Sequence, residues 1–240
     1  MLERYVAVDL EMTGLHPKTD RILEIGAVKV EDGKQEIFHR MVNPRMEISR
    51  KVTELTGITD EMVKDGCEPE RAAAEFREFA EGFPLVGHNL IYDYSFLKQC
   101  LVNHGETFEK DGVDTLKLAR KFLPEAEKKT LDYLCSYFQI SRKENHRALE
   151  DAKAEKLLFQ YLQEQFEAQE PEAFLPKPLL YRAKKQGPAT AKQKKYLKEL
   201  TDWHKIDLNV DLDSLTRNEA SRMTDKILAA YGKLSSRGGA

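Results

Sequence analysis

An α/β fold, with a mixed sheet flanked by helices, is predicted by the order of three kinds of pattern in the 240-residue sequence. Three strand-like runs, in which apolar and polar residues alternate, open the chain. Short strand-like runs then alternate with helical segments, and two further helical patterns follow a proline-rich stretch. Consecutive strands followed by strand–helix alternation are typical of a mixed sheet with helices packed against it.

The opening strands are expected in runs rich in Val and Ile, at residues 4–12, 21–32 and 34–44. The first two runs are separated by a turn sequence that contains Gly14 and Pro17. The dipeptide Asp32-Gly33 is typical of a two-residue hairpin turn, so the second and third strands are expected to form a hairpin.

Helical spacing replaces the strand pattern at residues 49–57 and 68–83. Short strands are then expected at 84–89 and at the beginning of 112–124, which gives a five-stranded sheet. The other helices of this region are expected in the rest of 112–124 and at 92–105, 130–140 and 147–168.

The C-terminal quarter of the chain has a different composition. Four prolines lie among charged residues, at Pro171, Pro176, Pro178 and Pro188, as is typical of a linker. We therefore predict a domain at residues 1–170, a Pro/Lys-rich linker at 171–189 and a small helical domain of unknown role at 190–234. Thr216 and Glu219 form a capping-box pattern at the start of its last helix, which is expected to end at Gly232.

The charges of the two regions differ in sign. Residues 1–176 carry a net negative charge and residues 177–240 a net positive one, and the two sum to −3. On the helix expected after the linker, lysines such as Lys194, Lys195 and Lys198 are interpreted as contacts for nucleic acid. Tyr196 and Trp203 have the spacing of core residues, so they are assigned to helix packing.

Several classes of protein are disfavoured by the sequence. The N-terminus does not resemble a secretory signal and no segment approaches the length of a membrane span, so a cytoplasmic location without membrane contact is expected. Cys67, Cys100 and Cys135 are odd in number and form no CxxC motif. This spacing argues against a disulfide framework and against a thiolate zinc site.

Two carboxylates lie inside the first apolar run, at Asp9 and Glu11. Residues i and i+2 of a strand point to the same face, so the two side chains are expected side by side near the strand's carboxyl end. The alternative is that both face water on an open side of the sheet. The Thr13-Gly14 turn immediately after them favours a functional site.

Further acids stand at the edges of later elements. Asp93 begins the helix after the fourth strand, and His146 and Asp151 flank the start of the long helix. Four carboxylates without a thiolate are a ligand set suited to Mg²⁺ or Mn²⁺. A pair of such ions can clamp both oxygens of an in-line phosphoryl displacement, so the sequence predicts phosphodiester hydrolysis.

Three motifs make the sequence resemble a known family. In order, "DLEMTG", "GHNLIYD" and "HRALEDA" resemble the exonuclease motifs of the DEDDh-type 3′-5′ exonucleases, the DnaQ-like family that includes the DNA polymerase III epsilon subunit. His146 and Asp151 have the H-x4-D spacing of that branch, and Arg147 stands where the DEDDy branch carries Tyr. The resemblance covers about residues 3–168 and implies an RNase H-like fold.

The resemblance also implies roles for individual residues. Asp9, Glu11, Asp93 and Asp151 would hold two ions, with Asp9 as the bridging ligand, and His146 would be the general base. An imidazole, with an ordinary pKa of about 6.5, suits that task. Substrate contacts are expected at Met12, Thr13, Gly14, Leu15, His88, Asn89 and Tyr92. Core packing is the alternative for Leu15 and Tyr92, and the remaining acids, such as Glu24, Glu54 and Asp114, are interpreted as solvated or capping groups.

The preferred function is a 3′-5′ exonuclease that releases nucleoside 5′-monophosphates from single-stranded DNA or RNA with a free 3′ end. One alternative is an oligoribonuclease-like enzyme for very short RNA, which the first motif also resembles. Another is a proofreading subunit bound to a DNA polymerase or to another replication or repair protein. A scaffold without turnover is disfavoured because all five key residues are present.

Overall fold

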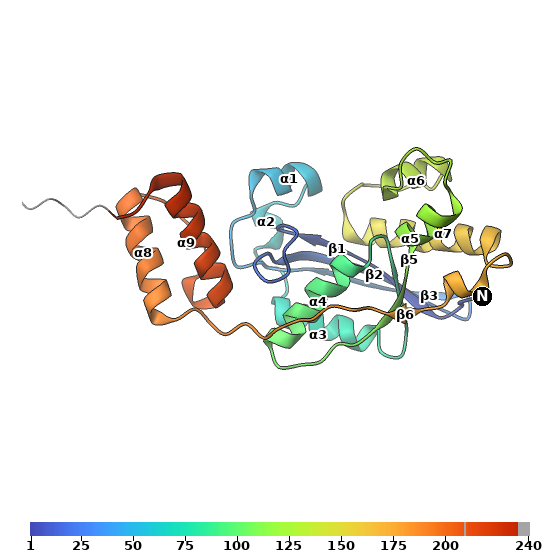
Figure 1. The fold of residues 1–240 in the computed structure, drawn as a ribbon, viewed down its shortest axis with the longest axis horizontal. Coiled ribbons are helices and arrows are strands. Elements are labelled where there is room, and N and C mark those ends of the chain that lie inside the picture. The colour runs from blue at the N-terminus through green and yellow to red at the C-terminus, as the bar shows by residue number, and fades with distance from the viewer. Residues whose placement is uncertain (209, 235–240) are drawn as a thin grey trace, which may run out of the picture.

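The computed structural model describes residues 1–208 and 210–234, and its centre is a single six-stranded sheet (Figure 1). The strand order is β3-β2-β1-β4-β5-β6. The central pairs β1–β4 and β4–β5 are parallel, and the outer pairs are antiparallel. The strands are β1 (Tyr5–Met12), β2 (Ile22–Glu31), β3 (Lys34–Met41), β4 (Leu85–Gly87), β5 (Asp111–Asp114) and β6 (Lys177–Pro178).

The mixed α/β class is therefore confirmed, and the five expected strands form one sheet. The structure adds β6, a two-residue strand at the open edge of β5 that the sequence did not predict. Pro178 lacks a backbone N–H and is tolerated in a sheet only at such an edge. At the hairpin between β2 and β3, Asp32 and Gly33 both have positive φ, as a type I′ turn requires.

Helices cover both faces of the sheet because β1 directs alternate apolar side chains to opposite sides. Val6, Val8 and Leu10 pack in one core cluster with residues of α3 and α4, whereas Tyr5 and Ala7 pack in another with residues of α5, α6 and α7. The helices of this region are α1 (Arg50–Thr56), α2 (Asp60–Val63), α3 (Pro69–Phe79), α4 (Ile91–Asn103), α5 (Thr115–Phe122), α6 (Leu131–Tyr137) and α7 (Ala148–Phe166).

The long helix α7 approaches β2 closely at Gly26. A Cβ atom at this position would lie 2.2 Å from the backbone carbon of Ala148, a distance that no real contact has. A glycine is therefore needed for the first turn of α7 to reach the sheet. This contact brings the beginning of α7, with its acidic residues, beside the carboxyl end of β1.

The C-terminal helices α8 (Ala191–His204) and α9 (Arg217–Tyr231) have a small core of their own. Both helices begin with a capping box, at Thr190 and at Thr216, and Gly232 follows the end of α9. The core contains Leu197, Leu200, Leu215, Ala220 and Ile227, with Tyr196 packed against it. The position of Tyr196 agrees with its assignment to packing, and the side chain of Trp203 is 39% exposed.

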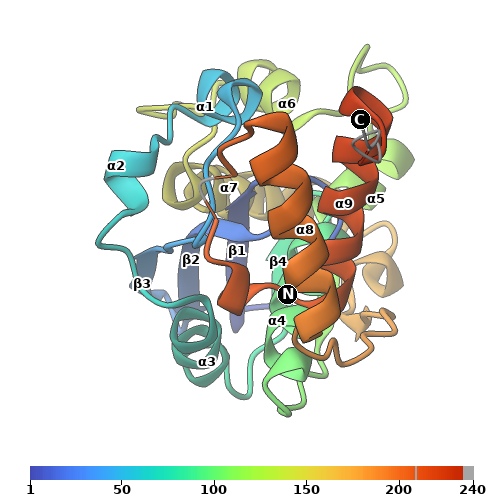
Figure 2. The ribbon, with the colours of Figure 1, turned by 90° about the vertical axis from the view of Figure 1, so that its left-hand side faces the viewer.

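The segment between α7 and α8 lies along the surface of the first region. It contains a 3-10 turn (Pro171–Phe174) and then β6. Beyond β6, Gln99 of α4 donates to the carbonyl of Lys184, and Asn103 accepts from the N–H of Gln186. The segment then reaches α8, and Figure 2 shows α8 and α9 in front of the sheet.

Within the described residues, none of the helices has the length and apolar character to cross a membrane. The three cysteines are free thiols, of which Cys135 is buried.

Candidate active site

The first two acids lie on β1, which is paired with β2 on one side and β4 on the other. Asp9 is opposite Gly26 of β2 and Glu11 is opposite Glu24. The Glu11 side chain is 9% exposed, so the alternative in which both acids face open water is wrong. A buried acid pair in the middle of a sheet requires compensation from its surroundings.

Asp93 reaches the same place from the first turn of α4. It is 5% exposed, and its Oδ1 accepts a hydrogen bond from the N–H of Leu10 at 3.1 Å. Because the pairing of β4 with β1 is at Val6 and Ala7, the later part of β1 lies open on this side to the helix that follows β4. Asp93 thus lies against the strand segment between Asp9 and Glu11.

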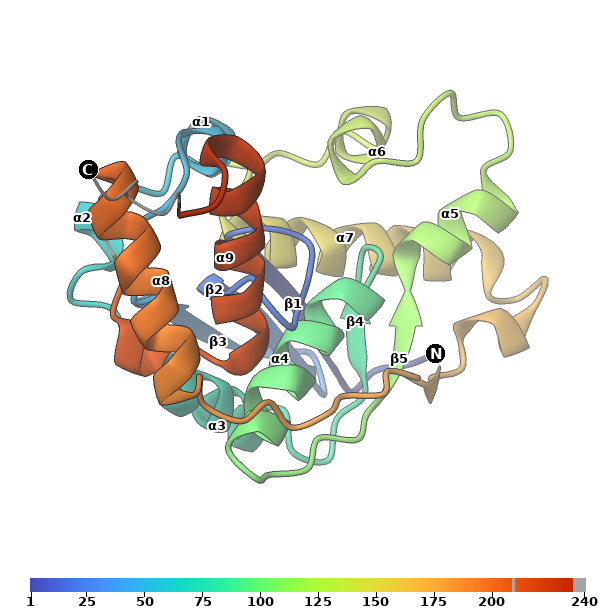
Figure 3. The same ribbon diagram turned by 60° about the vertical axis from the view of Figure 1, so that its left-hand side comes forward.

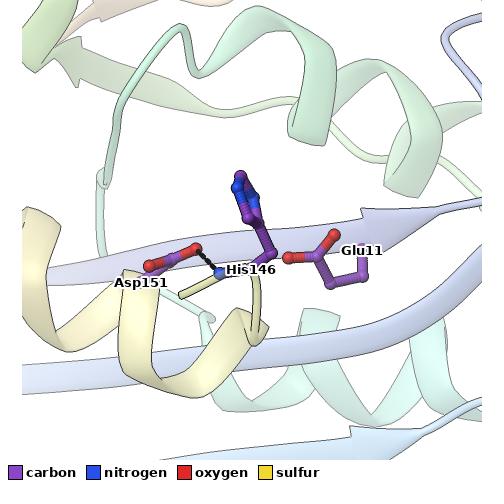
Figure 4. A group of neighbouring side chains, drawn as sticks. All are labelled: Glu11, His146 and Asp151. Atoms are coloured by element: carbon purple, nitrogen blue, oxygen red, sulfur yellow. Dashed lines mark hydrogen bonds between the residues drawn. The ribbon is translucent and has the colours of Figure 1, made fainter. Parts of the chain in front are cut away.

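Asp151 comes from the first turn of α7, where its Oδ2 accepts the N–H of His146 at 3.1 Å. His146 has a φ of 57°, a left-handed conformation that few side chains adopt outside tight turns or functional sites. Ligand atoms of Glu11, His146 and Asp151 lie within 4.8 Å of one another (Figure 4). The structure thus brings the predicted general base and two predicted metal ligands together.

Burial and mutual repulsion change the acidity of these groups. Burial raises the pKa of Glu11 to about 8, and repulsion from Asp151 adds to this effect. Burial likewise raises the pKa of Asp93 to about 8, although the N–H of Leu10 opposes the change. The pKa of Asp9 is raised well above its usual value by burial and by neighbouring carboxylates. A divalent cation among these oxygens would offset both the burial of the charged carboxylates and the repulsion between them.

A fifth carboxyl, Glu155, was not predicted from the sequence. It is fully buried one helical turn after Asp151, and its Oε1 accepts the N–H of His88 at 2.8 Å. Its Oε2 is buried and has no hydrogen-bond partner in the described part of the chain, and burial together with Asp93 raises its pKa well above the usual value. The i, i+4 spacing from Asp151 was the signal that would have placed it on the same helix face. A buried carboxylate oxygen left without a donor fits a site that receives a cation.

Arg142 is the other residue that the sequence did not indicate. Its guanidinium is almost buried and bonds to Asp151 and to Asp132, at 2.5 Å in each case. It thereby fixes the carboxylate of Asp151 between a guanidinium on one oxygen and the His146 N–H on the other. Arg142 lies in an irregular loop, where no periodic pattern reports its position.

The predicted substrate contacts at the surface lie in two places. Leu15 is 66% exposed in the turn after β1, and Tyr92 is 41% exposed at the start of α4. These exposures exclude core packing as the explanation for either residue. The N–H of Thr13 donates to the carbonyl of Arg21 at 2.8 Å, so this group is not free for a ligand. Met12 ends β1 and packs partly against the core.

His88 and Asn89 form the connection between β4 and α4. Both ring nitrogens of His88 have partners, the hydroxyl of Thr115 at 3.0 Å and the carbonyl of Lys129 at 2.7 Å. This placement favours a supporting role for the ring over direct contact with substrate. Asn89 has a φ of 66°, and its N–H donates to Asp114.

The acids interpreted as solvated or capping groups have three different environments. Glu54 is exposed beside Arg50, and Asp114 caps α5 by accepting the N–H of Leu116. Glu24 is not solvated, because its side chain is 1% exposed. It pairs with the guanidinium of Arg147 and accepts the N–H of Ala148, so it caps α7 from the neighbouring strand β2.

Carboxylates from β1, α4 and α7 thus converge at the carboxyl end of β1, and they are the kind of oxygen ligand that divalent metal ions prefer. Residues 6–159 match the model of the Exonuclease family, RNase_T, and the chain belongs to this family. The resemblance seen in the three motifs is therefore confirmed at the level of the family.

The relatives of known name include DNA polymerases. The chain is 42% identical over 156 residues to the DNA polymerase III PolC-type of Caldanaerobacter subterraneus, and 39% identical over 153 residues to that of Clostridium perfringens. These matches cover 65% and 63% of this chain but only 11% of each polymerase. The chain thus spans about a tenth of the length of these relatives.

Solved structures share the fold. Exonuclease X in complex with 5′ overhanging duplex DNA superimposes with a TM-score of 0.55 and 24% identity, over 68% of this chain and 92% of that one. Exonuclease I of E. coli in complex with a dA16 oligonucleotide superimposes with a TM-score of 0.56 and 18% identity, over 69% of this chain and 42% of that one.

Proposed function

We propose that the protein removes nucleoside 5′-monophosphates from the 3′ end of single-stranded DNA or RNA with two Mg²⁺ or Mn²⁺ ions. The observation that carries the proposal is the convergence of Asp9, Glu11, Asp93 and Asp151 with His146 beside them. The four carboxylates would hold the ions. When bound, such ions stabilise the attacking and leaving oxygens of an in-line displacement.

In this proposal His146 is the general base. Its side chain is 40% exposed, so the imidazole ring can reach a water molecule at the mouth of the site. The backbone N–H of His146 donates to Asp151. The bond to Asp151 and the left-handed backbone direct the residue out of α7. His146 would accept the proton of the attacking water as the new P–O bond forms.

The 3′-terminal nucleotide is proposed to lie between Leu15 and Tyr92. Both side chains are exposed although they are apolar or aromatic, as is usual for surfaces on which bases stack. The N–H of Gly14 has no hydrogen-bond partner within the described residues and is available for the terminal sugar or phosphate. Each of these roles is independent of the base sequence.

The named relatives favour DNA as the substrate and replication as the setting. Because they are polymerase chains that contain a region like this one, proofreading beside a DNA polymerase is the second candidate function. An oligoribonuclease-like activity on very short RNA is the third. The expected cytoplasmic location stays a prediction.

The proposed division of the chain assigns catalysis to residues 1–170, leaves 171–189 as the linker and gives 190–234 a role in holding substrate or partner. An open groove of about 690 Å³ between the turn after β1 and α9 supports the third assignment, and its lining includes Lys18 and Arg222. The lysines of α8 support it less, since Lys194 pairs with Asp213 and Lys195 lies near Glu199.

The test uses matched DNA and RNA strands labelled at the 5′ end, with Mn²⁺ or with EDTA. A ladder that shortens from the 3′ end, resistance of a circular strand and silence of the Asp9→Ala variant are expected. Equal cleavage of the circle would show an endonuclease and contradict the proposal. A DNA strand beside a dinucleotide RNA separates the first candidate from the oligoribonuclease-like one, and co-purification with a polymerase tests the second.

A further inference from the structure

The turn that follows β1, residues 13–20, is closed by Arg21. The N–H of Thr13 donates to the carbonyl of Arg21 at 2.8 Å, and the N–H of Arg21 donates to the hydroxyl of Thr13 at 2.9 Å. Arg21 and Thr13 therefore join the two ends of the turn through these backbone and hydroxyl hydrogen bonds. Any force that fixes Arg21 also fixes Thr13, which is two residues before the exposed side chain of Leu15.

The side chain of Arg21 is held by the C-terminal helices. Its Nε bonds to Glu219 of α9 at 2.7 Å, and its Nη1 bonds to the carbonyl of Pro44 at 2.5 Å. The two charged side chains are only 11% and 8% exposed. The second oxygen of Glu219 accepts the N–H of Thr216, so the same carboxylate caps α9 and binds the turn.

A second residue of α9, Arg222, contacts the last residues of the turn itself. Arg222 bonds to the hydroxyl of Thr19 and lies 3.3 Å from Asp20 Oδ1, whose partner oxygen accepts the N–H of His16. A Cβ on Gly14 would lie 2.4 Å from that second oxygen, so Asp20 packs directly against Gly14. The C-terminal end of the turn is thus attached to α9 at two neighbouring places, and Figure 3 shows this helix beside the loop from β1 to β2.

We propose that α8 and α9 position the turn for the 3′ end of the substrate, with Arg21 and Glu219 as the positioning pair. This inference rests on the proposed function. Removal of the Glu219 charge leaves the nearly buried guanidinium of Arg21 without its compensating charge. The position of Arg21 would then be less well fixed. The direct neighbour of Arg21 is Thr13, and the consequence is a displaced binding surface at Gly14 and Leu15. The metal-binding carboxylates on β1 and α7 would keep their places.

The decisive variant is Glu219→Gln, because an amide oxygen can still accept the Thr216 N–H and keep the helix cap while the charge is lost. The KM for a short single strand should rise roughly three- to thirtyfold, the size expected of changes that act through a neighbouring element. The kcat and the affinity for Mn²⁺ should stay within about twofold of wild type, as for the loss of a uniform binding contact. Hydrogen exchange of the Thr13 N–H should become faster.

Asp213→Asn is the matched control, since Asp213 pairs with Lys194 inside the helical pair and does not contact the turn. It should change neither KM nor exchange. A Glu219→Gln variant with unchanged KM, or with unchanged exchange at Thr13, would overturn the inference and leave the ion pair as a simple contact between two regions. If the wild type failed to shorten any strand, the proposed function would fall, and the exchange measurement would still decide whether the pair fixes the turn.

Discussion

Glu155 lies one turn of α7 beyond Asp151, and its buried Oε2 has no hydrogen-bond partner within the described residues. Both acids lie close enough to Asp9 on β1 to raise its pKa, and Glu155 is also repelled by Asp93 on α4. So many buried carboxyls in one place are costly when they are ionised, which makes the metal-free protein sensitive to pH.

The metal-free protein is predicted to lose stability between about pH 4 and pH 8. Ordinary carboxyls in an unfolded chain titrate near ~4. Folding raises the pKa of Glu11 and Asp93 to about 8, so the folded state binds more protons in this range and its advantage falls as pH rises. Melting curves with EDTA across this range measure the effect. Asp93→Asn should flatten the slope, and a slope of opposite sign would refute the assignment.

Loss of any predicted ligand should weaken Mn²⁺ binding and remove most of the activity. Asp9→Ala has the largest expected effect because Asp9 is proposed to bridge both ions. Calorimetry of Mn²⁺ binding and a gel assay check the two readouts separately. Glu150→Ala is the control, since Glu150 lies on the same helix as Asp151 but pairs with Lys153. Activity of Asp9→Ala in EDTA would exclude metal-dependent chemistry.

His146→Ala should slow the reaction by about 10² to 10⁴ while Mn²⁺ binding is retained, as expected for loss of a general base. Single-turnover rates with saturating substrate report the first effect, and calorimetry reports the second. The alternative is that His146 ligates an ion with Glu11 and Asp151, whose ligand atoms are close enough. Loss of Mn²⁺ binding in the variant would support that alternative.

Glu24→Ala should destabilise the protein by about 3–5 kcal/mol, because it leaves the Arg147 guanidinium without its buried partner. It also leaves the N–H of Ala148 without its acceptor. Glu54→Ala removes an exposed carboxylate beside Arg50 and should cost less than about 1 kcal/mol. Urea unfolding of both variants, with EDTA present, makes the comparison. Equal effects would show that Glu24 does not secure α7.

Leu15→Ala should weaken substrate binding without loss of stability, because the side chain is largely exposed. A base that covers this side chain removes its apolar surface from water, which is worth up to about 3 kcal/mol for a leucine, so a rise in KM of up to about a hundredfold is expected. Leu180→Ala removes an even more exposed leucine from the linker and should leave KM unchanged. A melting temperature that falls as far as the affinity would indicate a structural role.

Elements that depend on residues close together in the sequence could be predicted from the sequence. The hairpin at Asp32-Gly33 and the cap at Thr216 depend on a few neighbouring residues, and both lie where the sequence places them. The edge strand β6 could not be predicted, since its two residues have no strand pattern and its pairing depends on the open side of β5.

The residues of the candidate site that lie within the three motifs could be predicted from the sequence. Asp9, Asp93 and His146 were indicated by their positions in the three motifs; in the structure Asp9 and Asp93 are close enough to repel each other, and His146 lies beside Glu11 and Asp151. The burial of Glu24 could not be predicted, because its partner Arg147 is far along the chain and only the packing of α7 on β2 brings them together. The same holds for Thr13, whose N–H is taken by a residue after the turn.

The path of the segment between α7 and α8 has a consequence for how the two regions stay associated. Hydrogen bonds from Gln99 to Lys184 and from Gln186 to Asn103 fix the chain almost up to α8. The remaining tether is so short that docking of α9 is intramolecular, with an effective concentration on the order of millimolar or above. The contact around Arg21 therefore needs little intrinsic affinity to stay formed. Substitutions can therefore change the geometry of this contact to suit the substrate, because the two regions stay associated even when the contact itself is weak.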